Sequence, residues 1–220
     1  MTEVEWLACP DPTPMLEFLR DKASNRKARL FGVLCCRQNG DLFRDRRFHD
    51  AIRLAEGYAD GEVGEPERAA AESAALDAYE AHHFDELDDH LLVPAALIAR
   101  RYTLDFATAD ARRVTDAARW TGEMSFDGID VELQFEQSGY LRDLFGNPFR
   151  PVPYDSRWRT STAVALARTI YSDGTFDRLP ILADALEDAG CDNPDLLAHC
   201  RGDGPHVRGC WVVDLVLGKE

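Results

Sequence analysis

The sequence has no run of apolar residues long enough to cross a membrane. The roughly 18 or more consecutive apolar residues of a membrane-spanning helix occur nowhere among its 220 residues. The N-terminus also lacks the basic start, apolar run and small-residue cleavage site that together mark a secretory signal. We therefore expect a cytoplasmic protein with no membrane partner.

The motifs of several large enzyme classes are missing as well. No GxxxxGK[ST], GxGxxG, GxSxG or HExxH segment is present, so phosphate-loop, dinucleotide-binding, α/β-hydrolase and common zinc-protease activities have no motif to support them. The CxxC knuckle, which makes a zinc prediction strong, is also absent. The sequence leaves open whether the protein is an enzyme and favours a non-enzymatic role.

Positive charge is scarce. Lys and Arg number 25 against 40 Asp and Glu, which gives a net charge of −15. A surface this acidic repels a phosphate backbone and argues against nucleic acid as a partner. The six cysteines include the adjacent Cys35 and Cys36, and in a chain of this length they fit reduced thiols better than a secreted disulfide framework.

Apolar residues recur at helical spacing through most of the chain, and their 45% share is ordinary for a globular core. Caps and glycine stops place helices at 11–23, 24–40, 43–60, 66–101 with a kink at Pro94, and 108–120. In the first of these, Asp11 or Thr13 is the expected N-cap and Pro14 the first helical residue. Residues 129–135 alternate like a strand, but the stretch to 145 favours a helix.

The C-terminal region is the most regular. A proline-rich crossover near 146–155 precedes four helices at 160–176, 179–191, 194–204 and 206–218, and Pro205 is expected to open the last of them. Within the crossover, Arg150 lies near aromatic residues and could hold an anionic ligand, although packing is favoured. We predict an all-α fold, a single compact multi-helix domain over 1–220 with about nine to ten helices and C-terminal helical hairpins at 156–220.

Three blocks of the sequence resemble a family of uncharacterised proteins abundant in planctomycete bacteria. The blocks are EWLACPDPTPMLEFLRDKASNRKARLFGVLCCR at the start, LRDLFGNPFRPV in the middle and FDRLPILADALEDAGCDNPDLLAHCRGDGPHVRGCWVVDLVLGK at the end. The resemblance implies a bacterial cytoplasmic protein and a variable middle at 40–130 within the N-terminal region, residues 1–145. It implies no activity, ligand or catalytic residue.

Five metal-ligating side chains lie close together near the C-terminus, namely Cys191, His199, Cys200, His206 and Cys210. Structural zinc takes about four such ligands in a tetrahedron. Because His206 and Cys210 are four residues apart, they would share one face of a helix, and ligands from the preceding helix could meet them across the RGDG turn. The alternatives are that the cysteines are small apolar fillers, which the sequence favours, or that Cys200 is a catalytic thiol with a lowered pKa and access to solvent.

A second group occurs in the segment HHFDELDDH. His82, Glu86 and His90 are spaced four and four, so they would line one helical face, and imidazole with carboxylate suits a divalent transition metal. A plain charged face is the favoured interpretation, because one helix rarely completes a metal site alone.

These observations predict a non-enzymatic cytoplasmic protein-interaction or regulatory module that presents an acidic helical surface to an unidentified protein partner. No cofactor is expected, although zinc is possible. The alternative is a metal-dependent or thiol-dependent enzyme, or a structural zinc protein, built on the C-terminal Cys/His cluster.

Overall fold

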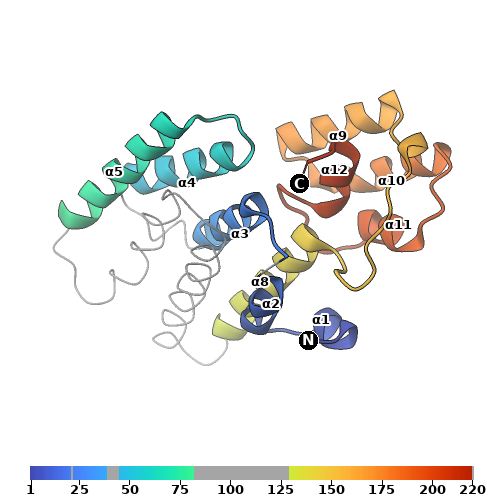
Figure 1. Cartoon of the computed structure of the whole chain (residues 1–220), viewed down its shortest axis with the longest axis horizontal. Helices are drawn as coiled ribbons and strands as arrows, with labels where there is room; N and C mark the ends of the chain where they lie inside the picture. Colours follow the sequence, from blue (N-terminus) through green and yellow to red (C-terminus); the bar gives the residue numbers. More distant parts are fainter. Residues whose placement is uncertain (21, 39–44, 82–128, 220) are drawn as a thin grey trace. The chain divides into compact units, whose positions relative to one another are not determined.

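The computed structural model of the chain describes residues 1–20, 22–38, 45–81 and 129–219. These residues form ten α-helices, nine of them seven residues or longer, and no strand (Figure 1). The all-α prediction is confirmed for these residues. The helices are α1 (Glu3–Ala8), α2 (Pro12–Leu19), α3 (Asn25–Gln38), α4 (Arg46–Ala59), α5 (Glu65–Ala81), α8 (Ile129–Phe145), α9 (Ser161–Asp173), α10 (Leu179–Asp188), α11 (Pro194–Arg201) and α12 (Trp211–Leu217), with short 3₁₀ turns η2 (Ser156–Trp158) and η3 (Phe176–Arg178).

The observed helix boundaries agree with most of the expected ones. Helix α2 is capped by Asp11, whose side chain accepts a hydrogen bond from the Thr13 amide, but it begins at Pro12 rather than at Pro14. Helix α8 runs without a break through the stretch that alternates like a strand, so the choice of helix there is confirmed. The helix expected at 108–120 and the second half of the one at 66–101 lie outside the described residues. No helix among the described residues has the length and apolar content needed to span a bilayer.

Contacts between Cα atoms divide the chain into two compact units. Unit 1 comprises Ala8–Ser138 together with Met1, and unit 2 comprises Gly139–Glu220 together with Thr2–Leu7. The expectation of one domain over 1–220 stays a prediction. In unit 1, α3 packs on α4 and α4 packs on α5, and buried Leu30, Phe31, Phe48 and Ile52 supply much of the apolar contact.

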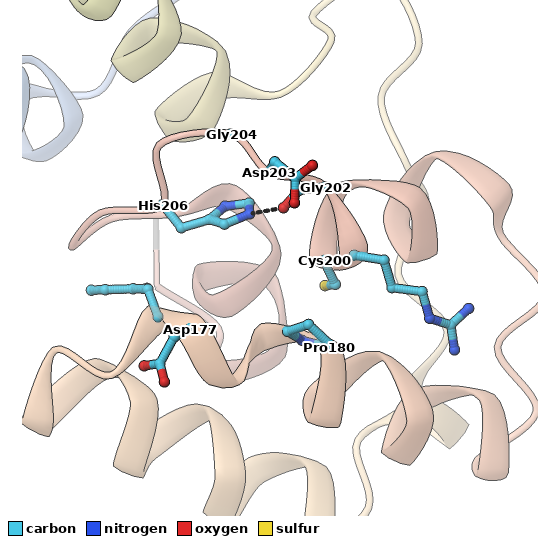
Figure 2. A pocket seen from close by; sticks show the side chains of 9 residues that line it. Asp177, Pro180, Cys200, Gly202, Asp203, Gly204 and His206 are labelled. Carbon is cyan, nitrogen blue, oxygen red and sulfur yellow. Dashed lines mark hydrogen bonds between the residues drawn. The ribbon is translucent and has the colours of Figure 1, made fainter.

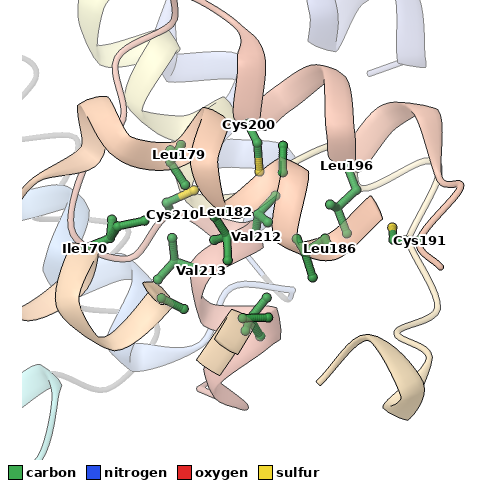
Figure 3. Close-up of a cluster of buried hydrophobic side chains, with 14 of the residues drawn as sticks. Ile170, Leu179, Leu182, Leu186, Cys191, Leu196, Cys200, Cys210, Val212 and Val213 are labelled. Atoms are coloured by element: carbon green, nitrogen blue, oxygen red, sulfur yellow. The ribbon is translucent and has the colours of Figure 1, made fainter. Parts of the chain in front are cut away.

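Unit 2 has its own apolar core, which holds the C-terminal helices together. Helix α9 packs on α10 and α12, and α10 packs on α11. Fully buried side chains such as Ile170, Leu182, Leu186 and Val213 fill the space between these helices (Figure 3). Burying a leucine-sized side chain contributes about 1.5–3 kcal/mol, so this cluster is the main source of stability for the unit.

Helix α1, which the sequence pattern did not predict, belongs to unit 2. The fully buried Trp6 donates a hydrogen bond from Nε1 to the carbonyl of Gly146 at 3.0 Å, and Arg142 Nε donates to the carbonyl of Trp6 at 3.1 Å. Glu3 pairs with Arg150 and accepts a hydrogen bond from Asn147 Nδ2. These contacts hold α1 against the C-terminal end of α8. They also give the Arg150 guanidinium a carboxylate partner.

Candidate metal centre

Four potential metal ligands converge in unit 2. They are Asp143 on α8, His199 on α11, His206 in the loop after α11, and Cys210, the N-cap residue of α12. One ligand atom from each of them lies within 4.8 Å of the ligand atoms of the other three. Asp143 and Cys210 are buried, with relative accessibilities of 2% and 0%, and the two histidine side chains are mostly covered.

The backbone around α11 explains how the two histidines and the cysteine meet. Asn193 caps α11 by accepting a hydrogen bond from the Leu196 amide at 3.0 Å, and the helix ends at Arg201 because Gly202 is extended. The following loop contains Gly204, Pro205 and Gly209, which do not favour helix, and it returns to α11, where the His206 ring lies 4.9 Å from the His199 ring between centroids.

The expectation that Pro205 opens the last helix is wrong, since α12 begins only at Trp211. Gly209 has a positive φ of 94°, which a right-handed helix does not allow, and the Val207 amide donates to the Asp143 side chain instead of to a helical carbonyl. His206 and Cys210 therefore do not share a helical face. They come together because the loop curves around Asp143.

The distances within the group are short. Asp143 Oδ1 lies 2.9 Å from His206 Nδ1 and 3.1 Å from His199 Nε2, and His199 Nε2 lies 3.3 Å from Cys210 Sγ. Zinc bonds of about 2.0–2.3 Å in a tetrahedron place neighbouring ligand atoms about 3.3–3.6 Å apart. A small outward adjustment of these side chains would accommodate one zinc ion.

Contacts outside the group orient two of its ligands. His206 Nε2 lies 3.2 Å from the carbonyl oxygen of Gly202, a contact drawn in Figure 2, and the Val207 amide donates to Asp143 Oδ2 at 2.9 Å. The first contact favours the tautomer with the proton on Nε2, which leaves a lone pair on Nδ1. The second leaves Asp143 Oδ1 facing the imidazoles. Metal-ligating histidines and carboxylates usually have such partners.

The contacts within the group depend on where its protons lie. His199 Nε2 faces both Asp143 Oδ1 and Cys210 Sγ, and a single N–H group points well at only one of them. If His206 is neutral and carries its proton on Nε2, the lone pair of Nδ1 faces a lone pair of Asp143 Oδ1 at a distance of 2.9 Å. Either a proton on His206 Nδ1 or a central cation would make this contact attractive.

The pKa shifts of the group show how its charges are balanced by protons. Burial opposes ionisation of Asp143, but hydrogen bonds from His199, His206 and the Val207 amide outweigh it, so the pKa of Asp143 is lowered. Burial likewise opposes charge on His206, yet the hydrogen bond and the charge of Asp143 leave the pKa of His206 raised. Burial, followed by the charge of Asp143, holds the pKa of the Cys210 thiol well above its usual value. Asp143 and His206 thus favour each other's charged forms, and binding of zinc would displace the proton of His206 and that of the Cys210 thiol.

The other two predicted cysteine ligands, Cys191 and Cys200, are not members of the four-ligand group. Both are buried in the apolar core of unit 2, to which Cys210 also belongs (Figure 3). Burial also raises the pKa of Cys200 to about 12, so neither condition for a catalytic thiol is met. All six cysteines are free thiols in the structure. The second predicted group, His82, Glu86 and His90, lies outside the described residues.

Asp143 is the ligand that the sequence pattern did not reveal. It lies between Leu141 and Leu144, two fully buried residues of α8, and a carboxylate among core positions is rarely left without a partner. That pattern in LRDLFG is the one feature that could have indicated it.

A surface cavity of about 390 Å³ adjoins the group. Asp177 and Pro180 contribute to one side of its lining, and Cys200, Gly204 and His206 contribute to the other (Figure 2). His206 therefore borders both the cavity and the four-ligand group.

Comparisons with known proteins find no matching family model, no matching curated protein and no matching solved structure. The resemblance to planctomycete proteins accordingly stays an expectation from the sequence blocks.

Proposed function

We propose that this protein is a helical zinc protein in which Asp143, His199, His206 and Cys210 hold one Zn²⁺ that stabilises unit 2. The observation that carries this proposal is the convergence of four ligand atoms of suitable chemistry around a buried carboxylate. One thiolate, two imidazoles and one carboxylate form a donor set that zinc accepts, whereas Ca²⁺ and Mg²⁺ prefer six or more oxygen ligands.

The role of the metal in this proposal is structural rather than catalytic. Catalytic zinc sites generally have three protein ligands and leave the fourth position to water or substrate. Here four protein side chains converge, and two of them are buried. The group links α8, α11 and the start of α12, so the ion would cross-link elements that are far apart in the sequence.

Within this proposal, the protein acts in the cytoplasm as a non-enzymatic interaction module. The net charge of −15 supports an acidic recognition surface. Helix α1 adds an apolar element, because Val4 and Leu7 are 76% and 52% exposed although both are aliphatic. Zinc would serve this role by keeping unit 2 rigid.

Cobalt substitution tests the metal site. Co²⁺ added to the zinc-free protein is expected to give the strong visible absorption of a tetrahedral complex and a sulfur-to-cobalt charge-transfer band, saturating at about one ion per chain. The variant Cys210→Ala should lose the charge-transfer band. The matched control is Cys200→Ala, since Cys200 is an equally buried thiol of the same core that lies outside the group. Weak octahedral absorption, or identical spectra for the two variants, would refute the site.

A further inference from the structure

The loop between α11 and α12 carries two of the four ligands and has little apolar anchoring of its own. Residues 202–205 are exposed, and residues 206–208 are only partly buried. Segments with few buried apolar contacts open locally before the rest of a fold. The order of this loop therefore depends on polar contacts to a greater extent than the order of the helices does.

Several of those polar contacts converge on Asp143. The His206 side chain and the Val207 amide both contact its carboxylate, and Cys210 ends the loop inside the same four-ligand group. Pro205 packs closely on α8, since a Cβ atom placed on Gly139 would lie 2.8 Å from Pro205 Cγ. The contact between His206 and Asp143, two residues that would bind the metal, is thus one of those that hold the loop against α8.

The same loop contributes to the cavity wall. Gly202, Asp203, Gly204 and His206 line the cavity, opposite lining residues from η3 and the start of α10 (Figure 2). If the loop left α8, His206 would move with it, and the cavity would lose that side. The state of the loop and the presence of the cavity are therefore linked.

We propose that zinc occupancy switches the segment Gly202–Gly209 between an open and an ordered state, and that the cavity beside His206 is complete only when zinc is bound. This inference rests on the proposed zinc site. It adds that the segment opens only after the metal has left, while the helices of unit 2 remain folded.

Hydrogen exchange of single amides, measured by NMR, tests the switch. The reporter is the Val207 amide, which is bound to Asp143, and the reference is the amide of Ile170 within α9, which lies in the core. In zinc-free protein, Val207 should exchange at least about ten times faster than Ile170, because the segment opens without global unfolding. When free zinc is buffered at about 100 times its Kd, exchange at Val207 should slow about 100-fold, since opening requires the ion to leave.

Each alternative gives a different result. If zinc binds but the Val207 rate does not change with free zinc, the segment opens with the metal in place and the switch is wrong. If Val207 and Ile170 exchange at the same rate without zinc, the segment has no separate open state and the switch is also wrong. If no zinc binds at all, the proposed function itself fails.

Trypsin provides a second measurement. The bond Arg201–Gly202 borders the segment and the bond Arg208–Gly209 lies within it, and Arg208 lies over the Tyr171 ring at 4.8 Å in the ordered loop. Cleavage after Arg208 should slow in proportion to free zinc in the wild type and in Cys200→Ala, and should not respond to zinc in Cys210→Ala. Equal protection of the two variants would contradict the proposal.

Discussion

The variants Cys210→Ala and Cys200→Ala should respond differently to zinc, although the two substitutions are chemically identical. Both sulfur atoms belong to residues with 0% accessibility in the core of unit 2. In the presence of a chelator, each variant should therefore lose a similar amount of stability, about 1 kcal/mol, for the deleted buried sulfur.

Zinc should separate the two variants. At free zinc about 100 times its Kd, an ion that binds only the folded state adds about 2.7 kcal/mol. For a chain of 220 residues this corresponds to a rise in melting temperature of about 5–11 °C. The wild type and Cys200→Ala should show that rise, whereas Cys210→Ala, which lacks a ligand, should show less than about a third of it.

Thermal unfolding followed by circular dichroism, with chelator and with buffered free zinc, measures the melting temperature of each protein in both conditions. The zinc site is refuted if Cys210→Ala gains as much from zinc as Cys200→Ala does. It is also refuted if the wild type gains nothing at zinc concentrations that saturate other four-ligand sites.

Three further predictions concern pH, thiol reactivity and one turn. Because Asp143 raises the pKa of His206, the stability of the zinc-free protein should fall as the pH rises from about 6.5 upward. In urea denaturation, His206→Gln should make the free energy of unfolding less dependent on pH. The affinity for zinc should instead rise with pH, because the ligands lose protons. In native protein a thiol reagent should modify Cys9 quickly and the five buried cysteines slowly; rapid labelling of two or more thiols would contradict the burial. Gly146→Ala should destabilise unit 2 by about 1–2 kcal/mol or more, because Gly146 has a φ of 62° and an added Cβ would lie 3.1 Å from the Trp211 ring. An unchanged denaturation midpoint would show that this turn tolerates a side chain.

Local sequence rules predicted most of the described helices. Two helices begin at the expected side-chain caps, Asp11 and Asn193. Two others, α9 and α12, end at glycines in the left-handed conformation, Gly174 and Gly218. Helix α1 was missed because it is only six residues long and exposes Val4 and Leu7, so it shows no apolar face. Its position is fixed by the contacts of Trp6 with residues far away in the sequence.

The candidate site was only partly predictable for the same reason. His199, His206 and Cys210 were identified by residue type, but the assumption of a helix over 206–218 gave the wrong explanation for their proximity. Asp143 lies 63 residues from His206 in the sequence, and no local pattern reports a contact over that separation. Cys191 and Cys200 have the right chemistry for zinc, yet tertiary packing places them in the apolar core.

The metal content of the purified protein tests the proposed zinc site most directly. Protein prepared without an affinity tag and without added metal would be analysed by inductively coupled plasma mass spectrometry, beside Cys210→Ala and Cys200→Ala. About one zinc per chain is expected in the wild type and in Cys200→Ala, and almost none in Cys210→Ala. A wild-type protein that contains no metal and takes up none when zinc is supplied would contradict the site.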